Sequence, residues 1–81
     1  MEDVKIRIDE IYVPAARRRE LDGDKVATLA ESILEDGLKL PISVRKDPKR
    51  YVLVEGMHRL EACKALGEDE ITAIIVRAKQ H

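Results

Sequence analysis

Aromatic residues are nearly absent from this chain of 81 residues, which has no Trp or Phe and only two Tyr, Tyr12 and Tyr51. This scarcity argues against the stacking platforms on which single-strand nucleic-acid binders place bases. Cysteine is equally scarce, and Cys63 alone cannot form an internal disulfide. Secretory segments and apolar runs of about 18 residues are also missing. We therefore expect a cytoplasmic protein with an aliphatic core and no membrane contact.

An excess of one charge is missing as well, because 15 Lys and Arg residues stand against 16 Asp and Glu residues. A broad basic face that grips DNA is not supported by this balance, whereas a local phosphate site is compatible with it. His58, His81 and Cys63 show no metal-ligand spacing, so no metal site is predicted. The length fits one domain over residues 1–81, and a ligand or a homodimer contact is expected to supplement so small a core.

The hydrophobic pattern predicts an α+β fold with a small mixed sheet and two principal helices. Strands are expected where apolar residues alternate or run together, and helices where they recur at i, i+3, i+4 and i+7. The predicted strands are 3–8, 38–45, 51–54 and 71–76, and the predicted helices are 25–36 and 57–66. The strand at 51–54 is continuously apolar, so we expect it to be central and covered on both faces.

Turn and cap residues set the expected boundaries of these elements. Asp24 is suited to cap the first helix, and Gly37 to end it. Pro41 indicates an edge strand or an irregular strand start. Residues 46–50 are expected to form a five-residue hairpin loop, and residues 9–23 a connecting loop that carries positive charge.

The junction at residues 55–59 is the segment best suited to chemistry, since it passes directly from an apolar strand into a helix. The start of a helix exposes unpaired amides and the positive end of the helix dipole. Gly56 would let a ligand approach the backbone, while His58 and Arg59 would add donors for phosphate oxygens. The alternative is a tight strand-to-helix turn with a His and an Arg on its surface.

Two further groups of residues are candidates for phosphate binding. Lys25, Thr28 and Ser32 have helical spacing, which places an ammonium and two hydroxyls on one stripe. Such a stripe lines a pocket or merely borders the buried face of the helix. The run Arg17 to Arg19 would bind a phosphate tail or a nucleic-acid backbone, or would be a solvated loop.

Two other residues have a reactive alternative. Glu55 would hold Mg²⁺ or act as a base, although a carboxylate at the end of a strand is ordinarily only solvated. Cys63 lies on the predicted inner face of the second helix. It is therefore interpreted as a small buried apolar residue and not as a nucleophile.

The order of these features resembles the ParB-like and sulfiredoxin superfamily from Val4 to Val76. Segments that look like the ParB N-terminal domain are Leu29-Ala30-Glu31-Ser32-Ile33, Asp36-Gly37-Leu38, Pro41-Ile42-Ser43-Val44-Arg45, Tyr51 to Gly56, His58-Arg59-Leu60-Glu61-Ala62 and Ala65-Leu66-Gly67. Arg17 or Arg18 falls near the early arginine motif of that family. ParB proteins usually contact nucleoside triphosphate with Gly-Glu-Arg-Arg. Here Gly56-Met57-His58-Arg59 is closer to the Gly-Cys-His-Arg of sulfiredoxins.

The resemblance implies a nucleotide pocket. Lys25, Thr28 and Ser32 match a lysine and two hydroxyls with which sulfiredoxins contact ATP, so this stripe and the Gly56 junction would face one nucleotide. The ligand would be ATP, ADP or CTP, with Mg²⁺ bridging its phosphate oxygens. Some free-standing relatives are kinases that use an acidic base, for which Glu55 and Glu31 are the candidates. The implied activities are nucleotide hydrolysis and phosphoryl transfer.

Two departures from the family pattern limit these expectations. Met57 stands where sulfiredoxins have the catalytic cysteine, and a thioether cannot replace a thiolate nucleophile, which argues against sulfinic acid reductase activity. The chain also has no room for the helix-turn-helix and dimerisation domains of partition ParB proteins. The alternatives are thus a DNA-associated partition accessory or nuclease, acting on DNA or with a DNA-binding partner protein, and a non-catalytic interaction domain.

Overall fold

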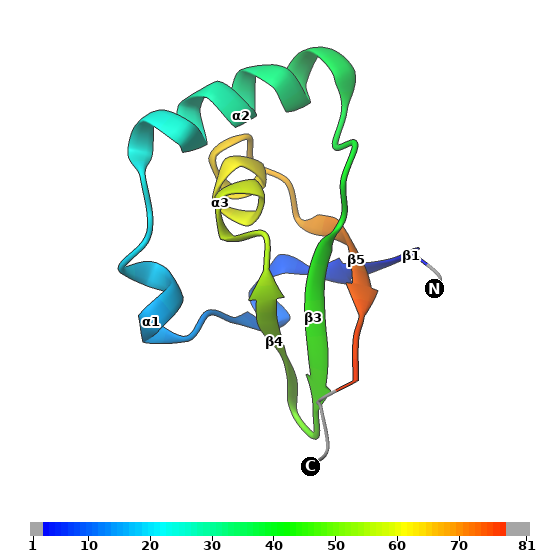
Figure 1. Ribbon diagram of the computed structural model, residues 1–81. Helices are drawn as coiled ribbons and strands as arrows, with labels where there is room; N and C mark the ends of the chain where they lie inside the picture. Colours follow the sequence, from blue (N-terminus) through cyan, green and yellow to red (C-terminus); the bar gives the residue numbers. More distant parts are fainter. Residues whose placement is uncertain (1–2, 78–81) are drawn as a thin grey trace.

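The computed structural model describes residues 3–77, and it forms a twisted sheet with its two longer helices at one end (Figure 1). In chain order, the elements are β1 (Asp3–Arg7), the 3-10 helix η1 (Ile8–Glu10), β2 (Ile11–Tyr12), α1 (Ala15–Arg18), α2 (Gly23–Asp36), β3 (Ile42–Asp47), β4 (Arg50–Glu55), α3 (Met57–Ala65) and β5 (Glu70–Ile75). The predicted helices and the strands at 3–8 and 71–76 agree with these bounds within two residues.

The five strands form one sheet in the order β1-β5-β3-β4-β2. The β1–β5 and β3–β4 pairs are antiparallel, whereas the β3–β5 and β2–β4 pairs are parallel. The sheet is therefore mixed, as predicted for an α+β fold with two principal helices. The middle strand is β3, which pairs with β5 on one side and with β4 on the other.

The core lies between the sheet and α3, and α2 packs on the far side of α3 (Figure 1). It is aliphatic, as expected from the scarcity of aromatic residues. The buried cluster consists of Ile6, Ile8, Val13, Ile42, Val44, Leu53, Met57, Leu60, Cys63, Ile71 and Ala73. Six of these eleven residues come from β3, β4 and α3, the three elements that meet near Gly56, so the candidate junction is anchored in the core.

The connection predicted as one loop over residues 9–23 is wrong in part. It contains η1, the two-residue strand β2 and the four-residue helix α1. Elements this short cannot display a hydrophobic period of 2 or 3.6, so pattern reading does not detect them. Strand β2 pairs with β4 at Tyr12 and Val52, and it thereby sends the following chain toward the Gly56 junction.

The cap expected for the first helix is also wrong. Helix α2 begins two residues earlier than predicted, with Asp22 as its N-cap. The carboxylate of Asp22 accepts hydrogen bonds from the amides of Asp24 and Lys25, at 2.9 and 3.4 Å. Both aspartates are good capping residues, and the sequence alone does not choose between them.

Strand β3 starts later than predicted. The alternation of Leu38 and Leu40 continues that of Ile42, but pairing with β5 begins only at Ile42. Residues 38–41 therefore form a connection. Pro41 marks an irregular start, and the edge interpretation is wrong because β3 is the middle strand.

The hairpin that joins β3 to β4 is tighter than the predicted five-residue loop. Asp47 pairs with Arg50, which leaves Pro48 and Lys49 as the turn. The next strand, predicted as central, is internal and lies between β3 and the short β2. Val52 and Leu53 point to opposite faces and are both buried, so the expectation of cover on both faces is confirmed at these two residues.

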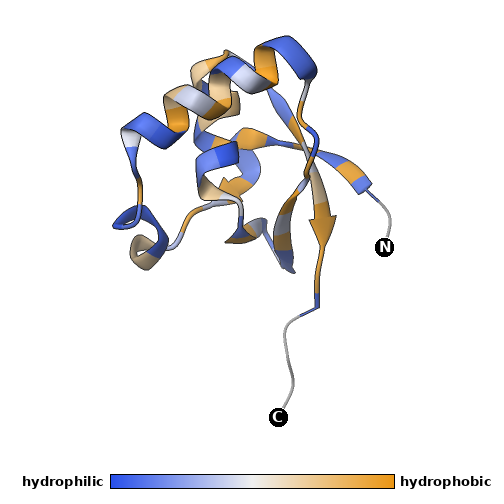
Figure 2. Cartoon of the chain, turned by 45° about the horizontal axis from the view of Figure 1, so that its top comes forward, coloured by the Kyte–Doolittle hydropathy of each residue, from blue (hydrophilic) through white to orange (hydrophobic). Residues whose placement is uncertain are grey.

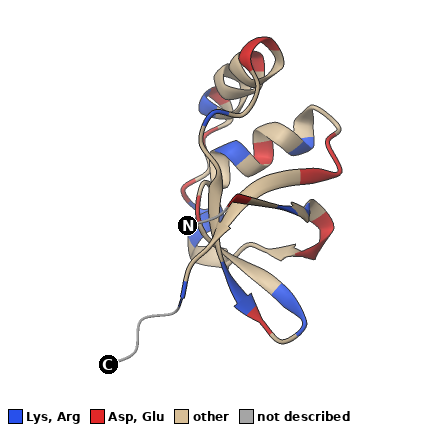
Figure 3. Ribbon diagram, turned by 90° about the vertical axis from the view of Figure 1, so that its right-hand side faces the viewer, with Lys and Arg blue, Asp and Glu red and all other residues tan. Residues whose placement is uncertain are grey.

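Polar and apolar residues alternate along α2, whereas charges of both signs are spread over helices and strands (Figures 2 and 3). In the part of the chain that the structure describes, no helix has the length and apolar character needed to cross a membrane.

Candidate functional site

The site is built around the turn from β4 into α3. Gly56 has φ 102° and ψ 30°, in the left-handed region that favours glycine. A Cβ at this position would lie 2.7 Å from Cγ2 of Ile42, a core residue with no exposed surface. The glycine is therefore required by the backbone and by the packing of Ile42, independently of any ligand.

The start of α3 has no side-chain cap. Gly56 occupies the N-cap position, and its carbonyl accepts from the amide of Leu60. The backbone amides that come before Leu60 in this first turn have no acceptor within the helix. Gly56 has no side chain that could accept from them. These N–H groups and the positive end of the helix dipole are suited to an anion.

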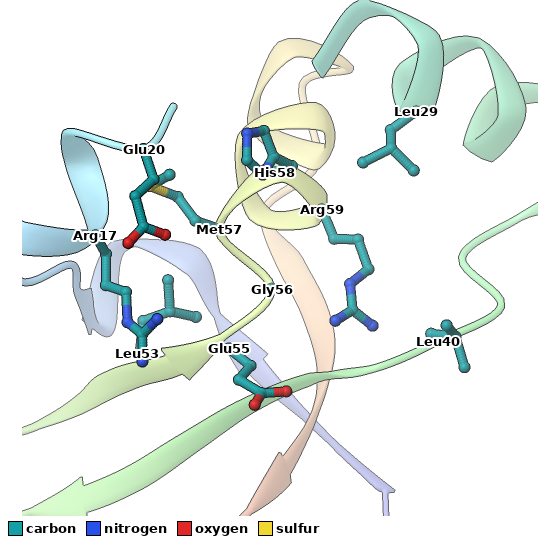
Figure 4. A pocket seen from close by; sticks show the side chains of 10 residues that line it. All are labelled: Arg17, Glu20, Leu29, Leu40, Leu53, Glu55, Gly56, Met57, His58 and Arg59. Carbon is teal, nitrogen blue, oxygen red and sulfur yellow. The ribbon is translucent and has the colours of Figure 1, made fainter. Parts of the chain in front are cut away.

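This turn opens into a cavity of about 560 Å³ (Figure 4). It combines an apolar wall with two arginines, two glutamates and the imidazole of His58. The lining residues are Arg17, Glu20, Leu29, Leu40, Leu53, Glu55, Gly56, Met57, His58 and Arg59. The volume is in the range of small-molecule sites.

Arg59 is placed by a bond to the main chain. Its Nη1 donates to the carbonyl oxygen of Pro41 at 2.8 Å, and the guanidinium is half-buried between α3 and the α2–β3 connection. A guanidinium has several N–H groups in one plane, so this bond orients Arg59 and leaves other N–H groups for a ligand. In Figure 4 the side chain reaches into the space between Glu55 and Leu40.

His58 makes a different kind of contact. Its Nε2 accepts a hydrogen bond of 3.0 Å from the backbone amide of Asp22. An amide nitrogen can only donate, so Nε2 carries the lone pair and the ring proton is on Nδ1. His58 is therefore neutral in this arrangement, and it bridges α3 to the start of α2.

A second cavity of about 400 Å³ adjoins the first, because Leu29 and His58 line both. Lys25 and Thr28 of α2 line this second cavity, together with Asp24. The structure thus brings two members of the predicted stripe next to the Gly56 junction. Ser32 lies one turn further along α2, is exposed, and lines neither cavity.

The two candidate bases are separated. Glu55 ends β4 and lines the first cavity, whereas Glu31 is exposed on α2 and lines neither. Within residues 3–77, no three His, Cys, Asp or Glu side chains gather as a metal site would require.

Sequence reasoning missed Glu20, which follows α1 and lines the first cavity beside Arg17. No local pattern marks Glu20, because it reaches the cavity only through the path of α1. Within the arginine run, Arg17 lines this cavity and Arg18 lines another, with Met57 between them. The signals for Arg17 in the sequence were the arginine run itself and the resemblance to the family's early arginine motif.

Cys63 lies in the core and is 3% exposed. Burial raises the pKa of its thiol, and the nearby charge of Glu68 adds to the rise. A thiol in this setting is a poor nucleophile, in agreement with its interpretation as a small apolar residue. Met57, at the position of the sulfiredoxin cysteine, is also buried in the core.

Comparison with known proteins identifies relatives along the whole chain. A model of the ParB N-terminal domain matches residues 1–81. A probable chromosome-partitioning protein ParB from Campylobacter jejuni is 44% identical over 71 residues, which make up 86% of this chain and 26% of that protein. The chain thus spans about a quarter of the length of this curated relative.

Solved structures show the same fold. Sulfiredoxin from Arabidopsis thaliana superposes with a TM-score of 0.86 and 33% identity, over 96% of this chain and 88% of that one. A C-terminally truncated ParB from Caulobacter crescentus, complexed with CTP-γ-S, has a TM-score of 0.83 and 24% identity, over 99% and 47%. A free serine kinase mutant in complex with ADP has a TM-score of 0.81 and 24% identity, over 94% and 31%.

The family model matches the whole sequence, and solved structures of ParB and sulfiredoxin have the same fold as this chain. This chain belongs to the ParB N-terminal domain family.

Proposed function

We propose that this domain binds a nucleoside triphosphate or diphosphate, with the phosphates at the N-terminus of α3. The observation that carries the proposal is the uncapped first turn after Gly56, which opens into a cavity lined by Arg17 and Arg59. Backbone amides, a helix dipole and guanidinium groups that converge on one cavity match the charge and the hydrogen-bonding needs of phosphate oxygens.

Each element of the site has a role in this proposal. The amides of the first turn of α3 and the remaining N–H groups of Arg59 bind phosphate oxygens, and Arg17 approaches from α1. Lys25 and Thr28 line the adjoining cavity, which takes the rest of the nucleotide. Ser32 lines neither cavity, so it would contribute only if the nucleotide extended one turn further along α2.

The comparisons support a nucleotide without choosing its base. One structure of the same fold holds CTP-γ-S and another holds ADP, so phosphate recognition is the feature that they share.

Glu55 is the carboxylate best placed for Mg²⁺ or for catalysis. Mg²⁺ is typically held by one or two carboxylates together with substrate phosphates, and Glu55 lines the proposed phosphate cavity. The bound ion would neutralise charge on the phosphate oxygens. In hydrolysis or phosphoryl transfer, Glu55 would accept the proton of the attacking hydroxyl, whereas Glu31 would need to be brought in from outside both cavities.

Calorimetric titration of ATP, ADP and CTP, with and without Mg²⁺, tests this proposal. Arg59→Ala should weaken binding by about 1.5 to 3 kcal/mol, because charged hydrogen bonds to phosphate are lost. Arg19→Ala is the matched control, since Arg19 is exposed and lines neither cavity. No binding of any of the three nucleotides, or unchanged affinity in a folded Arg59→Ala variant, would overturn the assignment.

A DNA-associated role is the second candidate, and kinship with a chromosome-partitioning protein is the observation that favours it. Binding through phosphates should fall steeply as salt rises in a gel-shift assay, and no shift at low salt would exclude this role for the domain. Light scattering on the same samples tests the homodimer expected from the small core. A monomer that binds neither nucleotide nor DNA would be an interaction domain.

A further inference from the structure

Helix α2 is held to the rest of the fold in an unusual way. It has 14 residues and none of them is buried, and its main packing partner is α3. The segment that contains α2 is tied at both ends by consecutive residues of the first turn of α3. His58 accepts from the amide of Asp22 before the helix, and Arg59 donates to the carbonyl of Pro41 after it.

The two ties differ in what they leave available for a ligand. Arg59 donates one N–H group to the carbonyl of Pro41, and its other N–H groups are available to a ligand. The Nε2 atom of His58 has only one position for a partner. This atom accepts from the Asp22 amide only while it carries its lone pair, and it donates to an anion only while it carries a proton, so it cannot do both at once.

We propose that His58 is a positioning residue that holds α2 against α3 through the Asp22 amide, and that protonation of its ring releases this end of α2. We call the hydrogen bond from the Asp22 amide to His58 the latch. Its role in nucleotide binding rests on the proposed function, because Lys25 and Thr28 reach the nucleotide only while α2 is held in place. Phosphate binding itself belongs to the α3 amides and Arg59.

The hydrogen bond from the Asp22 amide to His58 lies at the N-terminus of α2, at the residue that caps this helix. The backbone amide of Asp22 meets His58 while its carboxylate caps α2 through the amides of Asp24 and Lys25. Loss of the His58 contact therefore moves the capping residue and, with it, the first turn of α2. That turn carries Lys25, which lines the cavity shared with His58.

Charges around His58 come from each element beside it. Asp24 and Lys25 of α2 line one cavity with it, and Arg17, Glu20, Glu55 and Arg59 line the other. The carboxylate of Asp22 lies at the latch itself. Acidic and basic groups of this set nearly balance.

Two variants separate a positioning role from a phosphate-ligand role. His58→Gln keeps a side-chain oxygen that accepts from the Asp22 amide, whereas His58→Lys provides only donors. A positioning role predicts that His58→Lys loses about tenfold in affinity for ATP or CTP and that His58→Gln loses clearly less. The reverse order would overturn the proposal, because it would make His58 a phosphate ligand.

The pH dependence of affinity gives a second readout with opposite signs for the two roles. The contact with Asp22 requires an unprotonated Nε2, so affinity in the wild type should fall as the pH is lowered. A phosphate ligand would instead gain affinity as it becomes charged. His58→Gln is the control, because its profile records the titration of the nucleotide and of other groups, and a wild-type profile no different from it would also overturn the proposal.

Amide hydrogen exchange at Asp22, followed by NMR without nucleotide, tests the latch independently of the proposed function. At about pH 7.5, exchange should be slower in the wild type and in His58→Gln than in His58→Lys. A protected Asp22 amide with no nucleotide binding would keep the latch and overturn the proposed function. Nucleotide binding with equal exchange in all three proteins would keep the function and overturn the latch.

Discussion

The two principal helices of this domain differ in a way that their sequences do not suggest. Helix α2 has the clearer amphipathic pattern, yet none of its 14 residues is buried, and Leu34 is 75% exposed. Helix α3 has nine residues and a less regular pattern, yet Met57, Leu60, Ala62 and Cys63 are all buried. The strength of a hydrophobic stripe therefore says which side of a helix turns inward and does not say how completely that side is covered.

Position in the fold explains the difference. Helix α3 lies between the sheet and α2, so it has neighbours on two sides (Figure 1). Helix α2 packs mainly on α3, and only Ile33 of α2 reaches the buried cluster. One helix thus belongs to the core, and the other is a cover that packs mainly on α3.

Truncating one leucine on each helix should give the largest contrast. Leu60→Ala removes a side chain with no exposed surface and should lower the free energy of unfolding by about 2 to 5 kcal/mol. Leu34→Ala, on the exposed side of α2, should change it by less than about 0.5 kcal/mol. Urea denaturation of both variants measures the contrast. Equal losses would show that α2 is buried against something in solution.

Alanine at two glycines should give the next largest difference. Gly56→Ala places an alanine in a left-handed backbone conformation, and its Cβ clashes with Ile42. We expect the free energy of unfolding to fall by roughly 2 to 4 kcal/mol. Gly37→Ala, at the end of α2, imposes a similar φ of 79° in open space and should cost only about 1 to 2 kcal/mol. Thermal unfolding checks the order, and a smaller loss at Gly56 would contradict the packing against Ile42.

Removal of the two aspartates at the start of α2 should give the smallest effects. Asp22→Ala removes the cap and should cost about 1 kcal/mol, because amides of the first turn lose their acceptor. Asp24→Ala removes only a charge near the helix dipole and should cost about half as much. Chemical denaturation at low salt measures both, and a larger loss for Asp24 would restore it as the cap.

Much of the fold could be read from the sequence where elements are long. The period of two in residues 3–8 and the helical stripe from Val26 to Leu34 correctly placed β1 and α2, because each repeats its pattern several times. The hairpin turn at Pro48 and the strand start at Ile42 could not be read this way. Both depend on which residues find a partner on a neighbouring strand, and alternation continues past the last paired residue.

In the candidate site too, local features could be predicted from the sequence, whereas contacts between distant segments could not. The Gly56 junction was visible in the sequence, because a strand that runs directly into a helix has a local signature. The use of His58 as an acceptor and the arrival of Glu20 were not visible, since both arise from contacts between segments distant in the chain. His58 and Asp22 are separated by 36 residues.

The sequence by itself determined that this chain builds an aliphatic α+β core with a glycine turn ahead of a helix, because these features follow from periodicity and local backbone preference. Only the tertiary structure decided which helix is core and which is cover, and that His58 and Arg59 contact the main chain before and after α2, at Asp22 and Pro41. The physical reason is that burial and hydrogen-bond partners are set by the packing of whole elements, to which a single segment contributes only one surface.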